Sequence, residues 1–133
     1  MKKYIQPWIL VSLVALVLLA SVLFFLYTSF ASDKAIFDAR GQKNVRVVLT
    51  DEGFIPKSIR IQRGTTITFT TTRKNEFWPA SNPHPSHFLY SGFDSKTPVQ
   101  EGDSWSYTFE LVGVWEYHDH IRSYFTGIIY VEP

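Results

Sequence analysis

The pattern of hydrophobic positions changes character near residue 31. From Trp8 to Phe30 the chain carries no charged residue and is rich in Leu, Val, Ile, Phe and Ala. A helix of that length, with a rise of 1.5 Å per residue, spans about 34 Å, which is enough to cross a hydrocarbon core of about 30 Å. The run therefore predicts one N-terminal transmembrane helix.

The flanks of this run bear on its orientation and its processing. Lys2 and Lys3 precede it, and the positive-inside rule places that end in the cytoplasm. Residues 29–31 (Ser-Phe-Ala) resemble the cleavage site of a signal peptide, but the apolar run is longer than the usual stretch of about 7–15 residues. We expect an uncleaved, single-pass signal-anchor over residues 1–31, with cleavage after Ala31 as the alternative. In both cases the remainder lies on the extracytoplasmic (periplasmic or extracellular) side of the cell membrane.

Beyond the anchor, the hydrophobic period becomes two. Residues 32–43 are mixed in charge and weakly periodic, which is typical of a linker. Apolar and polar residues then alternate in short runs separated by turn residues, over 44–50, 58–61, 65–72, 104–111, 114–119 and 128–131. Short alternating strands favour a β-sandwich or a small barrel. We expect one all-β domain over residues 44–133, with a core that includes Ile59, Ile61, Ile67, Phe69, Tyr107, Phe109, Trp115 and Tyr117.

Composition and charge narrow the classes of function. The chain is 45% hydrophobic and 17% aromatic, and buried aromatic residues offset the entropy cost of ordering, which argues against a disordered chain. The formal net charge is +1, from 13 basic and 12 acidic residues, so we expect no nucleic-acid partner. Cysteine is absent, which excludes disulfides, cysteine nucleophiles and thiolate-ligated metal centres.

The segment from Asn75 to Thr97 does not follow the strand pattern. Pro79, Pro83 and Pro85 exclude one regular strand. The segment is nevertheless too aromatic for a solvated linker, since it contains Phe77, Trp78, Phe88, Tyr90 and Phe93. A long loop with its own apolar side chains is usually functional.

All four histidines of the chain fall in two clusters. One is His84-Pro-Ser-His87, in the aromatic loop, and the other is His118-Asp-His120, at the end of a late strand. Imidazole is the commonest metal ligand, and a metal needs several donors from converging segments. On a strand, His118 and His120 share one face. The pattern predicts a metal site, and the alternative is a set of surface histidines at the rims of loops.

Two stretches of the domain resemble the cupredoxins. Residues 54–69, from Phe-Ile-Pro-Lys-Ser-Ile-Arg-Ile to Gly-Thr-Thr-Ile-Thr-Phe, resemble the opening strands of that family, and residues 113–120 with 127–129 resemble its copper-loop region. The resemblance implies a Greek-key β-sandwich preceded here by one transmembrane helix. It also implies a copper site with one early-loop histidine and a late strand that delivers a cysteine, a histidine and usually a methionine.

The copper-loop region departs from the family pattern at the ligands. Asp119 stands at the position of the cysteine, and the only methionine is Met1. A blue copper centre needs a thiolate, whereas nitrogen and oxygen donors favour Cu(II) in tetragonal geometry or Zn(II). By family position His87 matches the early-loop ligand, while His84, His118 and His120 are additional donors. Asp119 is either an oxygen ligand or an acceptor that orients a ligating imidazole.

These features predict a membrane-tethered, cupredoxin-like protein with a histidine-rich, non-blue (type 2-like) copper site, which captures, stores or delivers the metal. One alternative is a metal-free interaction module of a membrane complex, and a less favoured one is a type 2 copper enzyme. The sequence has no Gly-x-Ser-x-Gly elbow, phosphate-binding glycine loop or His-Glu-x-x-His helix, so we do not expect an enzyme. The expected partners are the membrane, a metal ion and an unidentified membrane-protein or redox partner.

Overall fold

The N-terminal part of the chain is one long apolar helix. The computed structural model describes residues 6–33 and 35–133, without the side chains of residues 29–33; Lys2 and Lys3 lie outside these residues. Helix α1 (Pro7–Asp33) contains the stretch Pro7–Thr28, whose mean hydropathy of 3.1 and length are sufficient to cross a membrane. The expected helix is confirmed, and its character fits a membrane anchor or a signal peptide.

The rest of the chain forms a separate folded unit over Ile36–Pro133. This unit begins earlier than the expected boundary at residue 44. Strand β1 (Phe37–Asp38) pairs in parallel with Ile59 and Arg60, and Ala39 is fully buried in the core. Residues 37–39, assigned to the linker by their weak periodicity, therefore belong to the domain.

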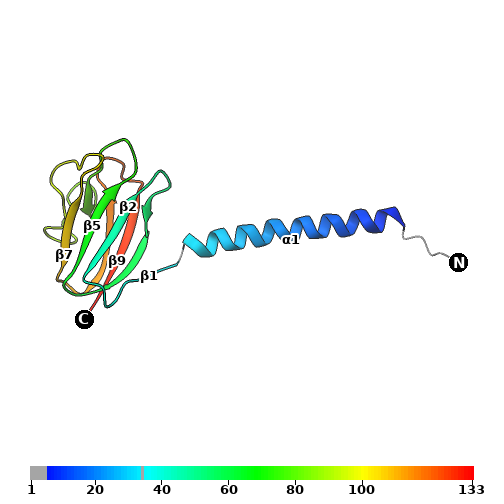
Figure 1. Cartoon of the computed structure of the whole chain (residues 1–133), viewed down its shortest axis with the longest axis horizontal. Helices are drawn as coiled ribbons and strands as arrows, with labels where there is room; N and C mark the ends of the chain where they lie inside the picture. The colour runs from blue at the N-terminus through cyan, green and yellow to red at the C-terminus, as the bar shows by residue number, and fades with distance from the viewer. Residues whose placement is uncertain (1–5, 34) are drawn as a thin grey trace. The chain divides into compact units, whose positions relative to one another are not determined.

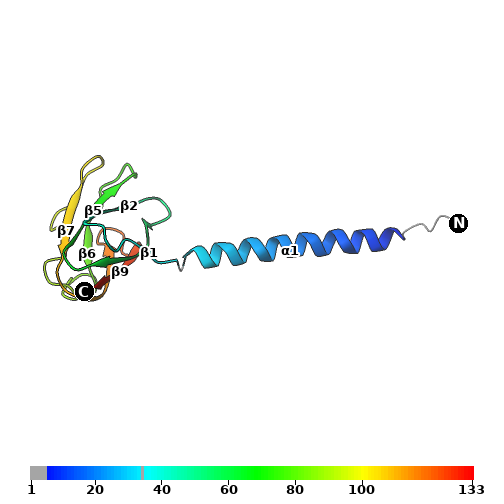
Figure 2. The ribbon, with the colours of Figure 1, turned by 60° about the horizontal axis from the view of Figure 1, so that its bottom comes forward.

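The domain is built from two mixed β-sheets. One contains β1 and, in chain order, β4 (Ser58–Gln62), β6 (Pro79–Ser81), β8 (Gly113–Asp119) and β9 (Thr126–Glu132). The other contains β2 (Asn44–Leu49), β3 (Phe54–Ile55), β5 (Thr65–Thr71) and β7 (Trp105–Phe109). Their spatial orders are β1-β4-β9-β8-β6 and β3-β2-β5-β7. Figure 1 labels β1, β2, β5, β7 and β9, and in Figure 2, where β6 is labelled as well, the labelled strands of the two sheets form two facing layers.

The core lies between the sheets because alternate side chains of each strand point inward. Burial alternates along β2, β5 and β9 with the period of two that the sequence indicates. Of the expected core residues, Tyr107 and Trp115 are only partly buried and pack against the core. The other six are buried: Ile59, Ile61, Ile67, Phe69, Phe109 and Tyr117.

The loop after β6 is fixed by its own aromatic residues. Tyr90 and Phe93 are buried in the same core, and the phenol oxygen of Tyr90 accepts hydrogen bonds from the main-chain N of Glu110 and Leu111 at 2.9 and 3.0 Å. Ser81 Oγ accepts a further bond from Tyr90 N at 2.8 Å. Phe88 alone among the aromatic residues of this loop is well exposed, at 70%. The histidines of the loop are thus held on an anchored segment.

Candidate metal centre

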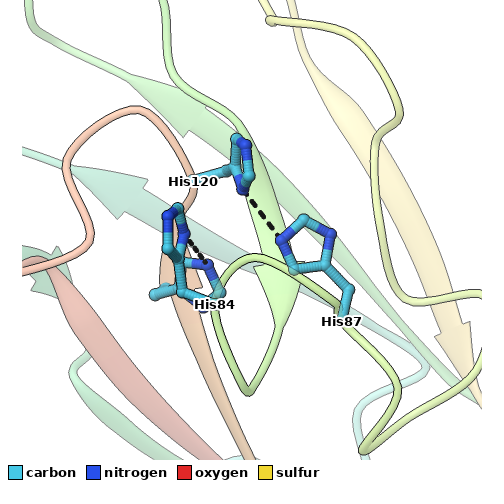
Figure 3. A group of neighbouring side chains, drawn as sticks. His84, His87 and His120 are labelled. Atoms are coloured by element: carbon cyan, nitrogen blue, oxygen red, sulfur yellow. Dashed lines mark hydrogen bonds between the residues drawn. The ribbon is translucent and has the colours of Figure 1, made fainter.

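Two segments of the domain bring four imidazoles together. His84 and His87 lie in the loop after β6, where Ser86 N and His87 N donate to Pro83 O at 3.0 and 2.9 Å. His118 lies on β8, and His120 follows the end of that strand. β6 is antiparallel to β8, with Ala80 opposite His118, so the loop leaves the sheet beside the strand that carries the other pair. Figure 3 shows the rings of His84, His87 and His120 turned toward one another.

The distances within this cluster fit a single metal ion. Each histidine offers one ring nitrogen, and the four nitrogens lie within 4.8 Å of one another. His84 Nδ1 is 3.3 Å from His118 Nε2, and His87 Nε2 is 2.9 Å from His120 Nδ1. With metal–nitrogen bonds of about 2.0–2.1 Å, ligand nitrogens are about 3.3 Å apart in a tetrahedron, and about 2.9 and 4.1 Å apart in a square plane. The two shortest nitrogen–nitrogen contacts, 3.3 and 2.9 Å, are close to these values.

The ring of His87 is oriented by Asp94. His87 Nδ1 donates to Asp94 Oδ2 at 2.9 Å, which leaves the lone pair of Nε2 directed toward His120. The same carboxylate accepts hydrogen bonds from Trp78 Nε1 at 2.6 Å and from Lys96 N at 2.8 Å. A carboxylate behind a ligating imidazole fixes its tautomer and raises its basicity. His87 has a backbone φ of 53°, a left-handed conformation that non-glycine residues rarely adopt and that recurs at functional sites.

The ring of His118 is oriented by an amide in the same way. His118 Nδ1 donates to Asn82 Oδ1 at 2.8 Å, while Asn82 Nδ2 donates to Glu116 Oε2 at 3.2 Å, which sets the orientation of the amide. The Nε2 lone pair of His118 therefore faces His84. In the metal-free protein, His84 Nδ1 donates to His118 Nε2, and His120 Nδ1 donates to His87 Nε2.

Trp78 forms one wall of the cluster. Its ring centroid lies 4.6 Å from that of His120, at an interplanar angle of 43°, and its main-chain O accepts a hydrogen bond from His120 N at 2.7 Å. Trp78 therefore lines the cluster rather than the centre of the core, and it is only partly buried. This contact holds His120 in place after the end of β8.

Burial and neighbouring groups shift the pKa values of His118, His120 and Asp94 in directions that favour binding of a cation. Burial, with the three neighbouring imidazoles, lowers the pKa of His118 to about 4. Burial and the imidazoles of His87 and His84 also lower the pKa of His120. Burial raises the pKa of Asp94, but hydrogen bonds from His87, Trp78 and Lys96 outweigh it and hold that pKa well below its usual range. At neutral pH, the imidazoles of His118 and His120 are thus uncharged and offer a nitrogen lone pair to a cation, beside the ionised carboxylate of Asp94.

Asp119 does not join the four imidazoles. It is fully buried. Its Oδ1 accepts from Trp78 N at 2.8 Å and from Ile121 N at 3.3 Å, and its Oδ2 accepts from Arg122 Nη1 at 3.1 Å. Among the described residues its hydrogen bonds go to these donors and to no imidazole, because successive side chains of a strand point to opposite faces. The geometry therefore differs from both roles that the sequence suggested for this carboxylate.

The two residues that orient imidazoles of this cluster, Asn82 and Asp94, are not among those selected from the sequence. Asn82 lies two residues before His84, and Asp94 follows Phe93 in the aromatic loop. Their positions in the loop gave no periodic signal. A search for carboxylate and amide acceptors near each histidine pair would have included them.

The comparisons with known proteins identify the fold. No protein-family model and no curated protein matches the sequence. A purple cupredoxin from Nitrosopumilus maritimus is 21% identical, with a TM-score of 0.58, over 66% of this chain and 99% of that chain. A Cu-containing nitrite reductase from Thermus scotoductus is 23% identical, with a TM-score of 0.56, over 68% of this chain and 22% of that one. A plastocyanin from Dryopteris crassirhizoma is 16% identical, with a TM-score of 0.53, over 65% of this chain and 99% of that chain. The domain has the cupredoxin fold, as the resemblance implied.

Proposed function

We propose that this protein binds one copper ion through His84, His87, His118 and His120. The observation that carries the proposal is the convergence of four ring nitrogens within 4.8 Å on a cupredoxin fold. Imidazole suits copper, and four neutral nitrogen donors satisfy its coordination without a further protein ligand. A set of surface histidines would not require two of its members to be aligned by Asn82 and Asp94.

The ligand set supports Cu(II) in a non-blue centre. Cysteine is absent and Met1 is the only methionine, so neither the thiolate nor the axial thioether of a blue copper site is available. Four imidazoles favour a tetragonal Cu(II) ion, and Zn(II) is the competing ion for a tetrahedral arrangement of the same nitrogens. In this proposal Asp119 is not a ligand and instead ties the end of β8 to Trp78 and Arg122.

The role proposed for the site is capture, storage or delivery of copper on the extracytoplasmic side of a membrane. The apolar stretch Pro7–Thr28 supports tethering by α1. A site with protein nitrogens at all four positions leaves no open position for a substrate, which supports binding of the metal as cargo rather than catalysis at it. Protease added to intact spheroplasts tests the topology: it should digest the domain while a cytoplasmic control protein survives, and protection of both would contradict the proposed side.

Copper titration of the full-length protein in detergent micelles tests the function. One Cu(II) should bind per chain, with weak visible absorption and a type 2 electron paramagnetic resonance spectrum that shows nitrogen hyperfine structure. Zn(II) should compete for the same site. Absence of stoichiometric Cu(II) binding by the folded protein would overturn the proposal and favour the metal-free interaction module.

A further inference from the structure

The four histidines differ in how firmly the protein holds them. His118 is 1% exposed, and the side chain of His87 is 8% exposed. His120 is partly buried, whereas His84 is exposed. Because exposure sets how easily a side chain can turn away into water, the four ligands are not equivalent.

The contacts behind each ring show the same asymmetry. His87 bonds to Asp94 and His118 bonds to Asn82, and His120 lies against the ring of Trp78. His84, in contrast, makes its one side-chain hydrogen bond among the described residues to His118, which is itself in the cluster. Its ring neighbours within the cluster are also histidines, with centroids 4.6 Å away at His120 and 5.2 Å away at His118. Among the residues that the structure describes, none outside the cluster forms a hydrogen bond that fixes the direction of the His84 ring.

We infer that His84 is an exchangeable ligand, whose place at the copper ion is taken by a nitrogen donor from outside the protein. This inference rests on the proposed copper site and names the point at which the cargo is taken up and released. In the exchange the bond from His84 to copper breaks and one bond from the incoming donor forms. The neutral imidazole of His84 moves into water, and no electron changes hands.

The three supported histidines retain the ion during the exchange. Moving the ring of His87 away from the centre breaks its bond to an ionised, 8% exposed carboxylate, and moving that of His118 breaks a bond to Asn82 inside the domain. Each movement loses a hydrogen bond to a group outside the cluster: Asn82 Oδ1 is then left without its donor, whereas Asp94 keeps its bonds to Trp78 and Lys96 but loses the one to His87. Turning His84 outward loses no hydrogen bond to a group outside the cluster among the described residues. The incoming ligand is therefore a monodentate nitrogen donor, such as an imidazole presented on the surface of a partner.

A matched pair of variants tests the inference, with free imidazole as the probe. His84→Ala and His87→Ala make the same change in the same loop and differ in the support behind the ring. Full-length protein is loaded with one equivalent of Cu(II) in micelles, and circular dichroism confirms that each variant is folded. We expect His84→Ala to lose at most about tenfold in Cu(II) affinity, and His87→Ala to lose at least about a hundredfold. If His87→Ala does not fold, His120→Ala takes its place.

Imidazole then distinguishes an accessible position from an enclosed one. Millimolar imidazole should restore the wild-type nitrogen hyperfine pattern in Cu(II)-loaded His84→Ala and leave the spectrum of the comparison variant unrestored. Equal losses of affinity in the two variants, or equal rescue by imidazole, would overturn the inference while leaving the copper site intact. Failure of the wild-type protein to bind Cu(II) would instead overturn the proposed function, and this inference with it.

Discussion

Replacing Asp94 by asparagine perturbs the copper site without removing a ligand. The two oxygens of Asp94 accept four hydrogen bonds: Oδ1 from Trp78 Nε1 and Lys96 N, and Oδ2 from His87 Nδ1 and Lys96 Nζ. Asparagine offers one acceptor oxygen and one NH2 donor group. In either orientation, the amide therefore places a donor against groups that are themselves donors.

The two orientations have different consequences. If the amide oxygen stays with Trp78, the NH2 group faces His87 Nδ1 and forces the other tautomer, which places a proton on Nε2 where the metal would bind. If the oxygen faces His87, the partly buried indole N–H of Trp78 loses its acceptor, which costs about 1 kcal/mol. Loss of a partner behind a ligating histidine typically lowers metal affinity by about 10–100-fold, which corresponds to about 1.4–2.8 kcal/mol.

The assay is competition for Cu(II) between the protein and a chromophoric chelator at pH 7. Asp94→Asn should show the loss above with an unchanged stoichiometry of one copper per chain. Asp103→Asn is the matched control, because Asp103 is exposed and its side chain forms no hydrogen bond with a histidine among the described residues. This change should leave the Cu(II) affinity unaltered. Equal Cu(II) affinities for Asp94→Asn and the wild-type protein would refute the claim that Asp94 orients His87.

Two further predictions concern the fold around the site. The pKa of His118 is lowered to about 4 in the folded domain, whereas its value in the unfolded chain is about 6.5, so between these pH values the unfolded chain binds more protons. The metal-free domain should therefore lose about 2 kcal/mol of stability between pH 7 and pH 5. Urea titrations at both pH values measure this loss, and equal stabilities would contradict it. Asp119→Asn should preserve the copper stoichiometry but lower the free energy of unfolding by about 1–3 kcal/mol, because the partly buried Arg122 loses its charge partner. A lost or spectrally altered copper site in a variant of unchanged stability would show that Asp119 is a ligand after all.

The sequence predicted the longer strands because each shows a period of two that matches its burial, except at the end of β8, where Tyr117, His118 and Asp119 are all buried. β2, β4, β5, β7, β8 and β9 all fall within or close to the expected ranges. β1, β3 and β6 are two or three residues long, too short to show a period. They form because neighbouring strands supply hydrogen-bond partners, as Ile59 and Arg60 do for β1, and such partners are not visible locally.

The convergence of the four histidines was predictable from the sequence, but the residues that orient their rings were not. The two histidine pairs could be matched because one ends a strand and the other lies in an aromatic loop, and the structure brings them together. The bonds of Asp94 to His87 and of Asn82 to His118 depend on how that loop folds, and no periodic pattern encodes it. Asp119 was placed at the site by family position, whereas the donors on its face of the chain engage both of its oxygens.

X-ray absorption spectroscopy of the Cu(II)-loaded, full-length protein tests the central claim most directly. Imidazole rings give a multiple-scattering pattern that separates them from backbone and carboxylate ligands, and the first shell reports the bond lengths. The four-histidine site predicts three to four imidazole nitrogens at about 2.0 Å and no sulfur scatterer. A first shell with fewer than three imidazoles, or a spectrum unchanged in a variant that lacks His87 and His120, would contradict it.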